Sequence, residues 1–136
     1  HERELAEAAQ PAPGAVALVR ELQARDCRLG ILTRNAHALA LLTLQAIGLD
    51  DCFASADVIG RDEAPPKPDP GGLLHLARQW QVPTQALVMV GDYLFDLECA
   101  RAAGAHGVLV NLPENPWPAL SSGYAEDCAE LLRQLS

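Results

Sequence analysis

The chain has 136 residues and a mass of 14.5 kDa, which is the size of one domain with a full hydrophobic core. Hydrophobic residues make up 49% of the chain and charged residues 21%, and this composition excludes a disordered polypeptide. The formal net charge of −8 disfavours a nucleic acid or an anionic membrane as a partner held by general electrostatic attraction.

The pattern of apolar residues also excludes a membrane-spanning segment. The longest uncharged stretch, between Asn35 and Asp50, contains polar residues and is too short to cross a bilayer. The four cysteines lie far apart in the sequence and form no zinc-binding or redox motif. We therefore expect reduced, structural thiols in a cytoplasmic protein.

The first half of the chain predicts two helices, two strands and a loop. Residues 15–24 carry apolar side chains at helical spacing, and residues 36–47 form a second helical run. Short apolar strands are expected at residues 27–33 and around residues 57–59. Residues 61–70 contain four prolines in ten positions, so this stretch must be a loop.

The second half continues the alternation of helices and strands. An apolar strand at residues 86–90 runs directly into Gly91 and Asp92, and a further strand is expected at residues 106–111. The expected helices are residues 73–82, 93–103 and 124–135. Helices that alternate with buried strands predict an α/β fold with a parallel sheet and helices on both faces.

A hydroxyl group and free backbone amides follow the first predicted strand, at Thr33, Arg34 and Asn35. Proteins of the α/β class bind ligands beyond the carboxyl ends of their strands, and N–H groups at the start of a helix suit an oxyanion or a phosphate. The three residues are therefore candidate substrate contacts. The alternative is that Thr33 only caps the following helix.

Lys67 lies in the proline-rich loop, between Pro66 and Pro68. Proline on both sides restricts the backbone, so the lysine loses less entropy when it binds than an ordinary surface lysine does. Lys67 is therefore a candidate fixed positive charge for an anionic group. The alternative is a solvated lysine in a stiff loop.

Asp92 and Asp96 follow the strand at residues 86–90 and are spaced four residues apart. On a helical turn this spacing places both carboxylates on one face, where they repel each other. A hard cation removes this repulsion, and Mg²⁺ commonly uses one or two carboxylates together with water and substrate oxygens. The alternative is that Asp92 caps the helix and Asp96 is merely exposed.

In this order along the chain, the hydroxyl, the lysine and the pair of aspartates resemble the haloacid dehalogenase superfamily, in particular its phosphatase branch with phosphoglycolate phosphatase. The segments that match the second, third and fourth motifs of the family are residues 31–35, 67–70 and 88–96. The resemblance covers residues 11–112 and implies a Rossmann-like core.

The resemblance also implies a role for each site residue. Thr33 would hydrogen-bond the transferring phosphoryl group, and Lys67 would neutralise the charge of the nucleophile and the phosphate. Asp92 would bind Mg²⁺, and Asp96 would be a second ligand or would orient a metal-bound water. Secondary contacts with the substrate are expected from Arg34 and Asn35.

The first motif of the family, an apolar strand followed by DxDx[TV], does not occur in this chain. In the family it supplies the aspartate nucleophile and precedes the other motifs. We therefore expect the nucleophile to lie upstream in a longer polypeptide and this chain alone to be inactive. Residues 1–10 would be the tail of a cap or linker helix, and residues 11–136 would be a partial core domain.

The strand that carries the first motif is central in the family, between the strands expected at residues 27–33 and 86–90. Its absence leaves two strand edges without hydrogen-bonding partners, which is costly. We expect that another copy or the missing N-terminal fragment supplies the strand, or that the two strands are paired directly or are shifted. A complete sheet built from these residues alone would contradict the strand assignment.

Two functions are compatible with these residues and motifs. The favoured one is a Mg²⁺-dependent phosphatase of small phosphorylated metabolites, such as phosphoglycolate or sugar phosphates, with an aspartyl-phosphate intermediate. The alternative is a non-catalytic relative that binds a metal, a phosphate or a protein partner. The sequence does not decide whether Tyr93 narrows the phosphate pocket or faces the core.

Overall fold

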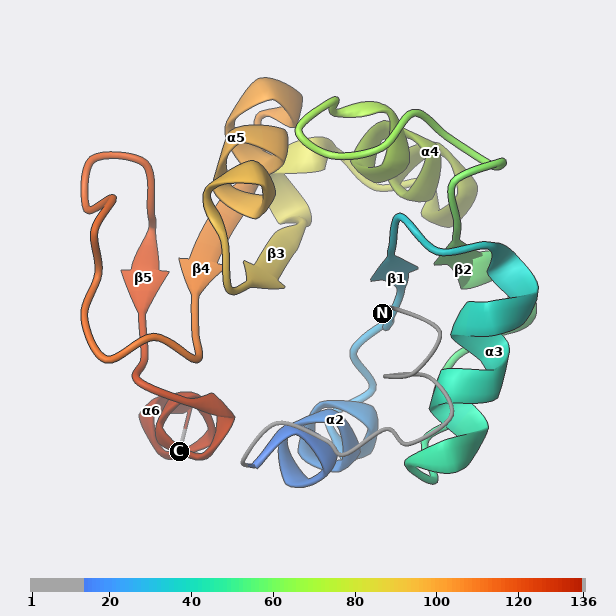
Figure 1. Cartoon of the computed structure of the whole chain (residues 1–136), viewed down its shortest axis with the longest axis horizontal. Helices are drawn as coiled ribbons and strands as arrows, with labels where there is room; N and C mark the ends of the chain where they lie inside the picture. The colour runs from blue at the N-terminus through green and yellow to red at the C-terminus, as the bar shows by residue number, and fades with distance from the viewer. Residues whose placement is uncertain (1–13, 136) are drawn as a thin grey trace.

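The computed structural model describes residues 14–135 and has the alternating order of helices and strands shown in Figure 1. The expected tail of a cap or linker helix, residues 1–10, lies outside the described residues. The helices are α2 (Ala15–Ala24), α3 (His37–Ala46), α4 (Gly71–Trp80), α5 (Leu94–Ala103) and α6 (Cys128–Leu135). The strands are β1 (Ile31–Leu32), β2 (Val58–Ile59), β3 (Val88–Gly91), β4 (His106–Leu109) and β5 (Gly123–Tyr124).

The predicted helices are confirmed, with shifts of one to a few residues at their ends. Helix α2 has the predicted bounds, and α3 stops where Gly48 follows with a φ of 76°. Helix α5 ends in the same way, because Gly104 adopts a φ of 81° as its C-cap. Both glycines adopt the left-handed conformation that commonly ends a helix, which is unfavourable for residues that carry a side chain.

Two details of the prediction are wrong. The last helix begins at Cys128 and not at Tyr124, because Gly123–Tyr124 forms strand β5, which pairs in parallel with β4. The first strand is confined to Ile31–Leu32, although the apolar run that predicted it starts at Cys27. Strands of two residues are too short for a hydrophobic period to reveal or delimit them.

All strand pairs are parallel, as predicted, but they form two separate sheets. Strand β1 pairs with β2, and β3 pairs with β4, which in turn pairs with β5. The two sheets lie on either side of the centre of the molecule, with β1 and β3 nearest to each other (Figure 1). Within residues 14–135, each of these two strands is paired on one edge only. Of the alternatives for these two strands, direct pairing does not occur in the described residues, and a strand supplied by another copy or by the missing fragment stays a prediction.

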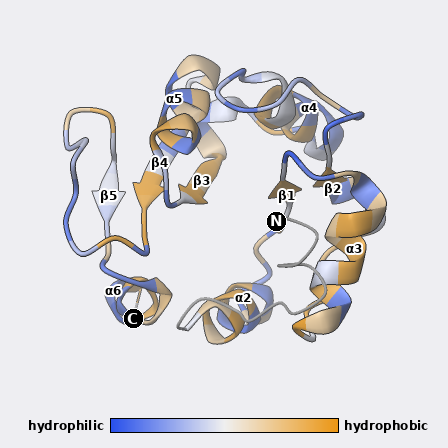
Figure 2. Cartoon of the chain, viewed as in Figure 1, coloured by the Kyte–Doolittle hydropathy of each residue, from blue (hydrophilic) through white to orange (hydrophobic). Residues whose placement is uncertain are grey.

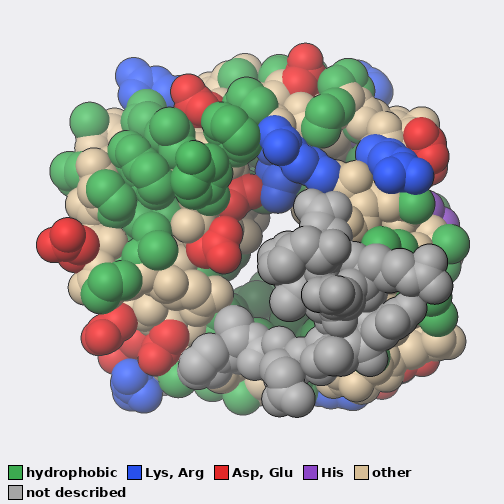
Figure 3. Space-filling model, in the orientation of Figure 1, with side chains coloured by type: hydrophobic (Ala, Val, Ile, Leu, Met, Phe, Trp, Pro, Cys, Tyr) green, Lys and Arg blue, Asp and Glu red, His purple; other side chains and the backbone are tan. Residues whose placement is uncertain are grey.

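Strand β3 leaves apolar side chains uncovered. Val88 is 58% exposed and Val90 is 40% exposed, whereas strands of parallel sheets are normally buried on both faces. Both β3 and β4 are strongly hydrophobic (Figure 2). The space-filling view shows a hollow at the centre of the molecule, with basic and acidic side chains at its rim (Figure 3). The described part of the chain thus has an open centre next to β3.

Most of the buried apolar residues fall into three separate clusters. The first joins α4 and α5 around Leu73 and Cys99, and the second joins α2 to α6 around Leu18 and Leu131. The third packs α3 against β2 around Leu44. The clusters hold the helices on the outer side of the strands, so the strand ends remain available for a site.

No helix within residues 14–135 is long and apolar enough to cross a membrane.

The four cysteines are free, and Cys99 and Cys128 are buried. His37 has a structural position, because its ring nitrogens lie 2.9 Å from the carbonyl oxygen of Val58 and 3.0 Å from Oγ of Ser55.

Candidate functional site

Thr33 follows β1 directly and extends the pairing with β2, because its N–H donates to the carbonyl oxygen of Ile59 at 3.0 Å. Its Oγ1 accepts a hydrogen bond from the N–H of Asn35 at 3.1 Å. The N-cap of α3 is Ala36, so the alternative that Thr33 caps this helix is wrong. In the described part of the chain the hydroxyl donates to no acceptor, and its proton is available to a ligand.

Arg34 and Asn35 continue this turn toward α3. Nη2 of Arg34 donates to the carbonyl oxygen of Lys67 at 2.7 Å, and its Cζ lies 4.9 Å from the centre of the Phe95 ring. The side-chain oxygen of Asn35 is buried and has no hydrogen-bond partner among the described residues. Buried polar atoms without a partner are uncommon, so this amide is not committed to holding the fold.

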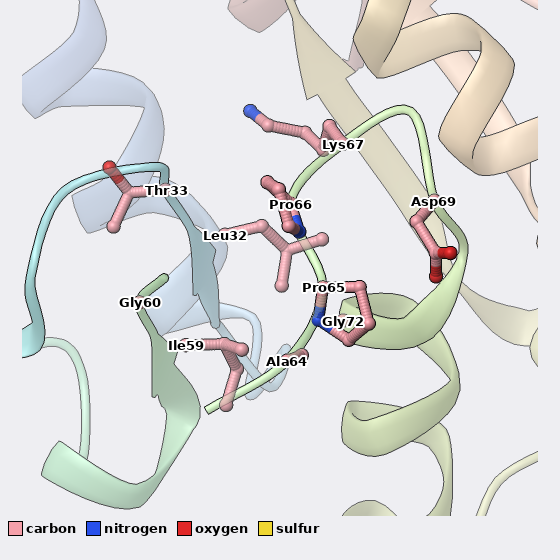
Figure 4. A pocket seen from close by; sticks show the side chains of 10 residues that line it. All are labelled: Leu32, Thr33, Ile59, Gly60, Ala64, Pro65, Pro66, Lys67, Asp69 and Gly72. Carbon is pink, nitrogen blue, oxygen red and sulfur yellow. The ribbon is translucent and has the colours of Figure 1, made fainter. Parts of the chain in front are cut away.

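Lys67 lines the same pocket as Thr33, between the ends of β1 and β2 and the proline-rich loop (Figure 4). The lysine side chain extends on the side of the pocket where the Thr33 hydroxyl lies. Its side chain is only 20% exposed, and its Nζ lies 2.7 Å from Oδ1 of Asp96. The alternative of a solvated lysine is therefore wrong.

Asp96 is buried in the first turn of α5, with 6% of its surface exposed. Its Oδ2 accepts the N–H groups of Asp92 and Tyr93 at 3.1 and 3.2 Å, and its Oδ1 faces the Lys67 ammonium. The alternative that Asp96 is merely exposed is therefore wrong. Its carboxylate connects the end of β3 to the proline-rich loop, and three donors already engage its two oxygens.

Gly91 makes this arrangement possible. A Cβ atom at this position would lie well under 3.0 Å from three atoms of the Asp96 side chain, which is closer than real Cβ atoms come. Only a residue without a side chain lets the carboxylate reach back to the N–H groups beyond β3. The glycine therefore determines where the Asp96 carboxylate, and with it the Lys67 ammonium, is held.

Asp92 is exposed beyond the end of β3, and its carboxylate has no partner within residues 14–135. The helix cap is Tyr93, so the alternative that Asp92 caps α5 is wrong. No group of three histidine, cysteine, aspartate or glutamate side chains that could hold a metal occurs in the described residues. Beyond the end of β3, the described residues thus offer one free carboxylate, which suits Mg²⁺ only when water and other oxygens complete its shell.

The proline-rich loop is also fixed behind Lys67. Oδ1 of Asp69 accepts the N–H of Gly71 at 2.8 Å at the start of α4, and Sγ of Cys99 donates to the carbonyl oxygen of Asp69 at 3.3 Å. Burial raises the pKa of the Cys99 thiol to about 11. The thiol therefore stays protonated near neutral pH and keeps its hydrogen bond to the loop.

Tyr93, the residue after Asp92, belongs to a group of aromatic side chains that contact one another. Tyr93 is 51% exposed, and its ring contacts Phe95 and Trp117 edge-to-face, with centroids 5.1 and 5.7 Å apart. The alternative that Tyr93 faces the core is therefore wrong. No residue pattern points to Phe95, Cys99 or Trp117 as part of the site, although Phe95 lies within the matching segment 88–96.

The structure brings the strand-end hydroxyl, the lysine and the aspartates to one region. Thr33 and Lys67 line one pocket, Lys67 pairs with Asp96, and Asp96 binds the backbone of Asp92. Such convergence beyond the carboxyl ends of parallel strands is typical of α/β proteins that bind an anionic ligand. The fold and the site together define a Rossmann-like protein with a candidate oxyanion site.

The particular family follows from the comparison with known proteins. The chain belongs to the haloacid dehalogenase-like hydrolases, because the model of this hydrolase family matches residues 1–104. It is 38% identical over 112 residues to a phosphoglycolate phosphatase of Rhodospirillum rubrum, a match that covers 82% of this chain and 46% of that protein. The chain therefore spans about half the length of the curated relatives that it matches.

Solved structures show the same fold. A crystal structure from Haemophilus somnus, described as a predicted phosphoglycolate phosphatase, has a TM-score of 0.81 and 21% identity and covers 91% of this chain and 56% of its own. A hydrolase of the same superfamily from Deinococcus radiodurans, solved with phosphate and sodium, has a TM-score of 0.76 and 22% identity, with coverages of 90% and 57%. The predicted Rossmann-like α/β fold is thereby confirmed.

Proposed function

We propose that the intact polypeptide is a phosphatase that hydrolyses phosphate monoesters of small metabolites, with phosphoglycolate or a sugar phosphate as the best candidate substrates. The single observation that carries this proposal is the convergence of Thr33, Lys67 and Asp92 at the strand ends. The kinship with a phosphoglycolate phosphatase supports the choice of substrate class.

The proposed chemistry assigns one task to each group of this chain. The Thr33 hydroxyl donates a hydrogen bond to an oxygen of the phosphoryl group, and Lys67 places a positive charge beside the same group. Phosphoryl transfer depends mainly on such positioning and charge neutralisation. Arg34 and Asn35, beside Thr33 in the same turn, are secondary contacts with the substrate.

We propose Mg²⁺ as the cofactor, held by Asp92. When bound, the ion would offset the negative charge of the phosphoryl group. Asp96 is engaged by Lys67 and two N–H groups, which favours an indirect role, such as orienting a metal-bound water, over that of a second direct ligand. In the proposed site, Asp96 therefore keeps the lysine and the backbone around Asp92 in place.

The nucleophile of the proposed reaction is an aspartate upstream of this chain. It would attack phosphorus and displace the alcohol, and water would then hydrolyse the aspartyl phosphate. The strand that carries it would lie between β1 and β3, and the unpaired edges and exposed valines of β3 support this placement. Under this proposal the chain of 136 residues alone is inactive.

Replacing Asp92 with asparagine tests the phosphatase proposal. In the intact polypeptide, Asp92→Asn is expected to lower phosphate release from an aryl phosphate with Mg²⁺ at least about a hundredfold, because the free carboxylate for the cation is lost. Calorimetric titration with Mg²⁺ is expected to show weaker binding. The matched control is Asp62→Asn, which changes an exposed aspartate of the proline-rich loop. No phosphate release by the wild type, or equal rates for Asp92→Asn, would contradict the proposal.

Completion of the sheet is a second testable part of the proposal. The carbonyl oxygens of Leu87 and Gly91 accept hydrogen bonds from the β4 side, so the backbone groups of Val88 and Val90 point to the free edge. Adding a peptide that spans the upstream strand is expected to slow hydrogen exchange at these two valines. If hydrogen exchange at the two valines instead slows as the concentration of this chain is raised, the free edge of β3 pairs with a second copy. Unchanged exchange in both experiments would contradict completion of the sheet.

The second candidate function is a non-catalytic module that binds a metal, a phosphate or a protein partner. The exposed edge and side chains of β3 favour it, since they offer a partner both hydrogen bonds and apolar contact. The coding sequence upstream of His1 separates the two functions, because an apolar strand followed by DxDx[TV] supports the enzyme and its absence supports the module. The four free thiols support a cytoplasmic location as part of either proposal.

A further inference from the structure

Arg34 connects three segments that each carry a residue of the candidate site. It follows Thr33 directly, its Nη2 donates to the carbonyl oxygen of Lys67 at 2.7 Å, and its guanidinium lies 4.9 Å from the centre of the Phe95 ring in the first turn of α5. In the described residues Arg34 forms no ion pair with an acidic side chain. Its contacts therefore serve the geometry of the site and not the neutralisation of a carboxylate.

The backbone around Lys67 has few other hydrogen bonds to fix it. Pro66 and Pro68 have no N–H group to donate, and the nearest turn bond runs from the N–H of Asp69 to the carbonyl oxygen of Pro66. The bond from Arg34 thus holds the lysine at its own carbonyl group. At the other end of the residue, the ammonium is held by Asp96.

We propose that Arg34 is a positioning residue that fixes Lys67 for catalysis through a clamp, in which its guanidinium hydrogen-bonds the lysine carbonyl and lies against the Phe95 ring. This inference rests on the proposed phosphatase function and adds to it, because Arg34 acts here through the lysine and not only as a contact with the substrate. A planar guanidinium can donate a hydrogen bond in its plane while its face stacks on a ring, and a lysine ammonium cannot do both.

The experiment measures Arg34→Gln and Arg34→Lys in the intact polypeptide with an aryl phosphate. A small displacement of a catalytic group is costly, so both variants are expected to lose about tenfold to a hundredfold in kcat, with a smaller rise in KM from the lost contact with the substrate. The inhibition constant of orthovanadate is expected to rise by the factor by which kcat/KM falls, since both report complementarity to the transition state. In a Lys67→Ala background, Arg34→Gln is expected to have no further effect on kcat.

The matched control is Arg28→Gln. Arg28 is an exposed arginine that also stacks on an aromatic ring, with its Cζ 5.3 Å from the centre of Trp80 and no contact with Lys67. The Arg28→Gln variant is expected to have the same Tm as Arg34→Gln and the same kcat as the wild type. Unchanged kcat in Arg34→Gln, a rise in KM alone, or full additivity with Lys67→Ala would overturn the inference.

A wild type that releases no phosphate counts against the proposed function and not against the clamp. In that case the crystal structure of Arg34→Gln decides, because the clamp predicts that Lys67 and its flanking prolines move away from Phe95. A loop at its original place in that structure would overturn the inference.

Discussion

Gly91→Ala is expected to destabilise the protein by about 2–4 kcal/mol and to reduce phosphate release by about a hundredfold, because the new methyl group displaces a buried carboxylate. The Cβ atom would occupy the position of the Asp96 side chain. As Asp96 moves away, the N–H groups of Asp92 and Tyr93 lose their acceptor and Lys67 loses its ion pair. Denaturant unfolding measures the stability, and phosphate release by the intact polypeptide measures the activity.

Gly123→Ala is the matched control for this substitution. Gly123 also lies in a parallel strand, but a Cβ atom there would be 3.6 Å from the nearest atom, in Val108, which is an ordinary contact. We expect a change below about 1 kcal/mol and unchanged activity, as for surface-like sites without a clash. Equal effects of the two alanines would show that Gly91 is a strand glycine with no special relation to Asp96.

Asp96→Ala is expected to be more damaging than Asp96→Asn. The alanine leaves two N–H groups and the Lys67 ammonium without an acceptor, at a cost of about 3–5 kcal/mol. The amide oxygen of asparagine can still accept from the N–H groups of Asp92 and Tyr93, so we expect about 1–3 kcal/mol for Asp96→Asn. Both variants are expected to lose most of the phosphatase activity, because neither side chain carries the negative charge that pairs with the Lys67 ammonium.

The control for the ion pair is Glu21→Gln, which removes the exposed partner of Arg25 one turn along α2. Exposed pairs of this kind contribute about 0.3–0.5 kcal/mol, so a small effect is expected. Unfolding free energies of the three variants, measured under the same conditions, test the order. A cost for Asp96→Ala no larger than that for Glu21→Gln would contradict the role given to Asp96.

The sequence predicted the helices well because their signals are local. The apolar spacing of residues 15–24 and the glycines after α3 and α5 act within a few residues, so no distant contact is needed to interpret them. The polar residues after β1 and β3 were found for a similar reason. A buried apolar strand that ends in Thr33 or Asp92 is visible in the sequence, and the parallel fold then implies that the two ends are close.

Features that depend on distant contacts could not be predicted. Strand β5 has two residues and exists through its pairing with β4, which no local pattern shows. The burial of Asp96 depends on the absence of a side chain at Gly91 and on the reach of Lys67 from another segment. The stacking of Arg34 on Phe95 joins residues 61 positions apart (95 − 34 = 61), and a single sequence carries no signal for such a pair.

The division of the buried residues into three clusters affects how the protein unfolds on heating. Each cluster is small, and the fully buried residues of each lie on different helices, although α2 also packs Val16 and Val19 against the third cluster. One cluster can therefore loosen while much of the rest persists. The Lys67 loop spans this division: it follows β2, which packs with α3, and leads into α4. A local opening along that boundary would separate the Lys67 ammonium from Asp96 before the helices unfold. Mild heating would then abolish activity while the circular dichroism of the helices is still that of the folded protein.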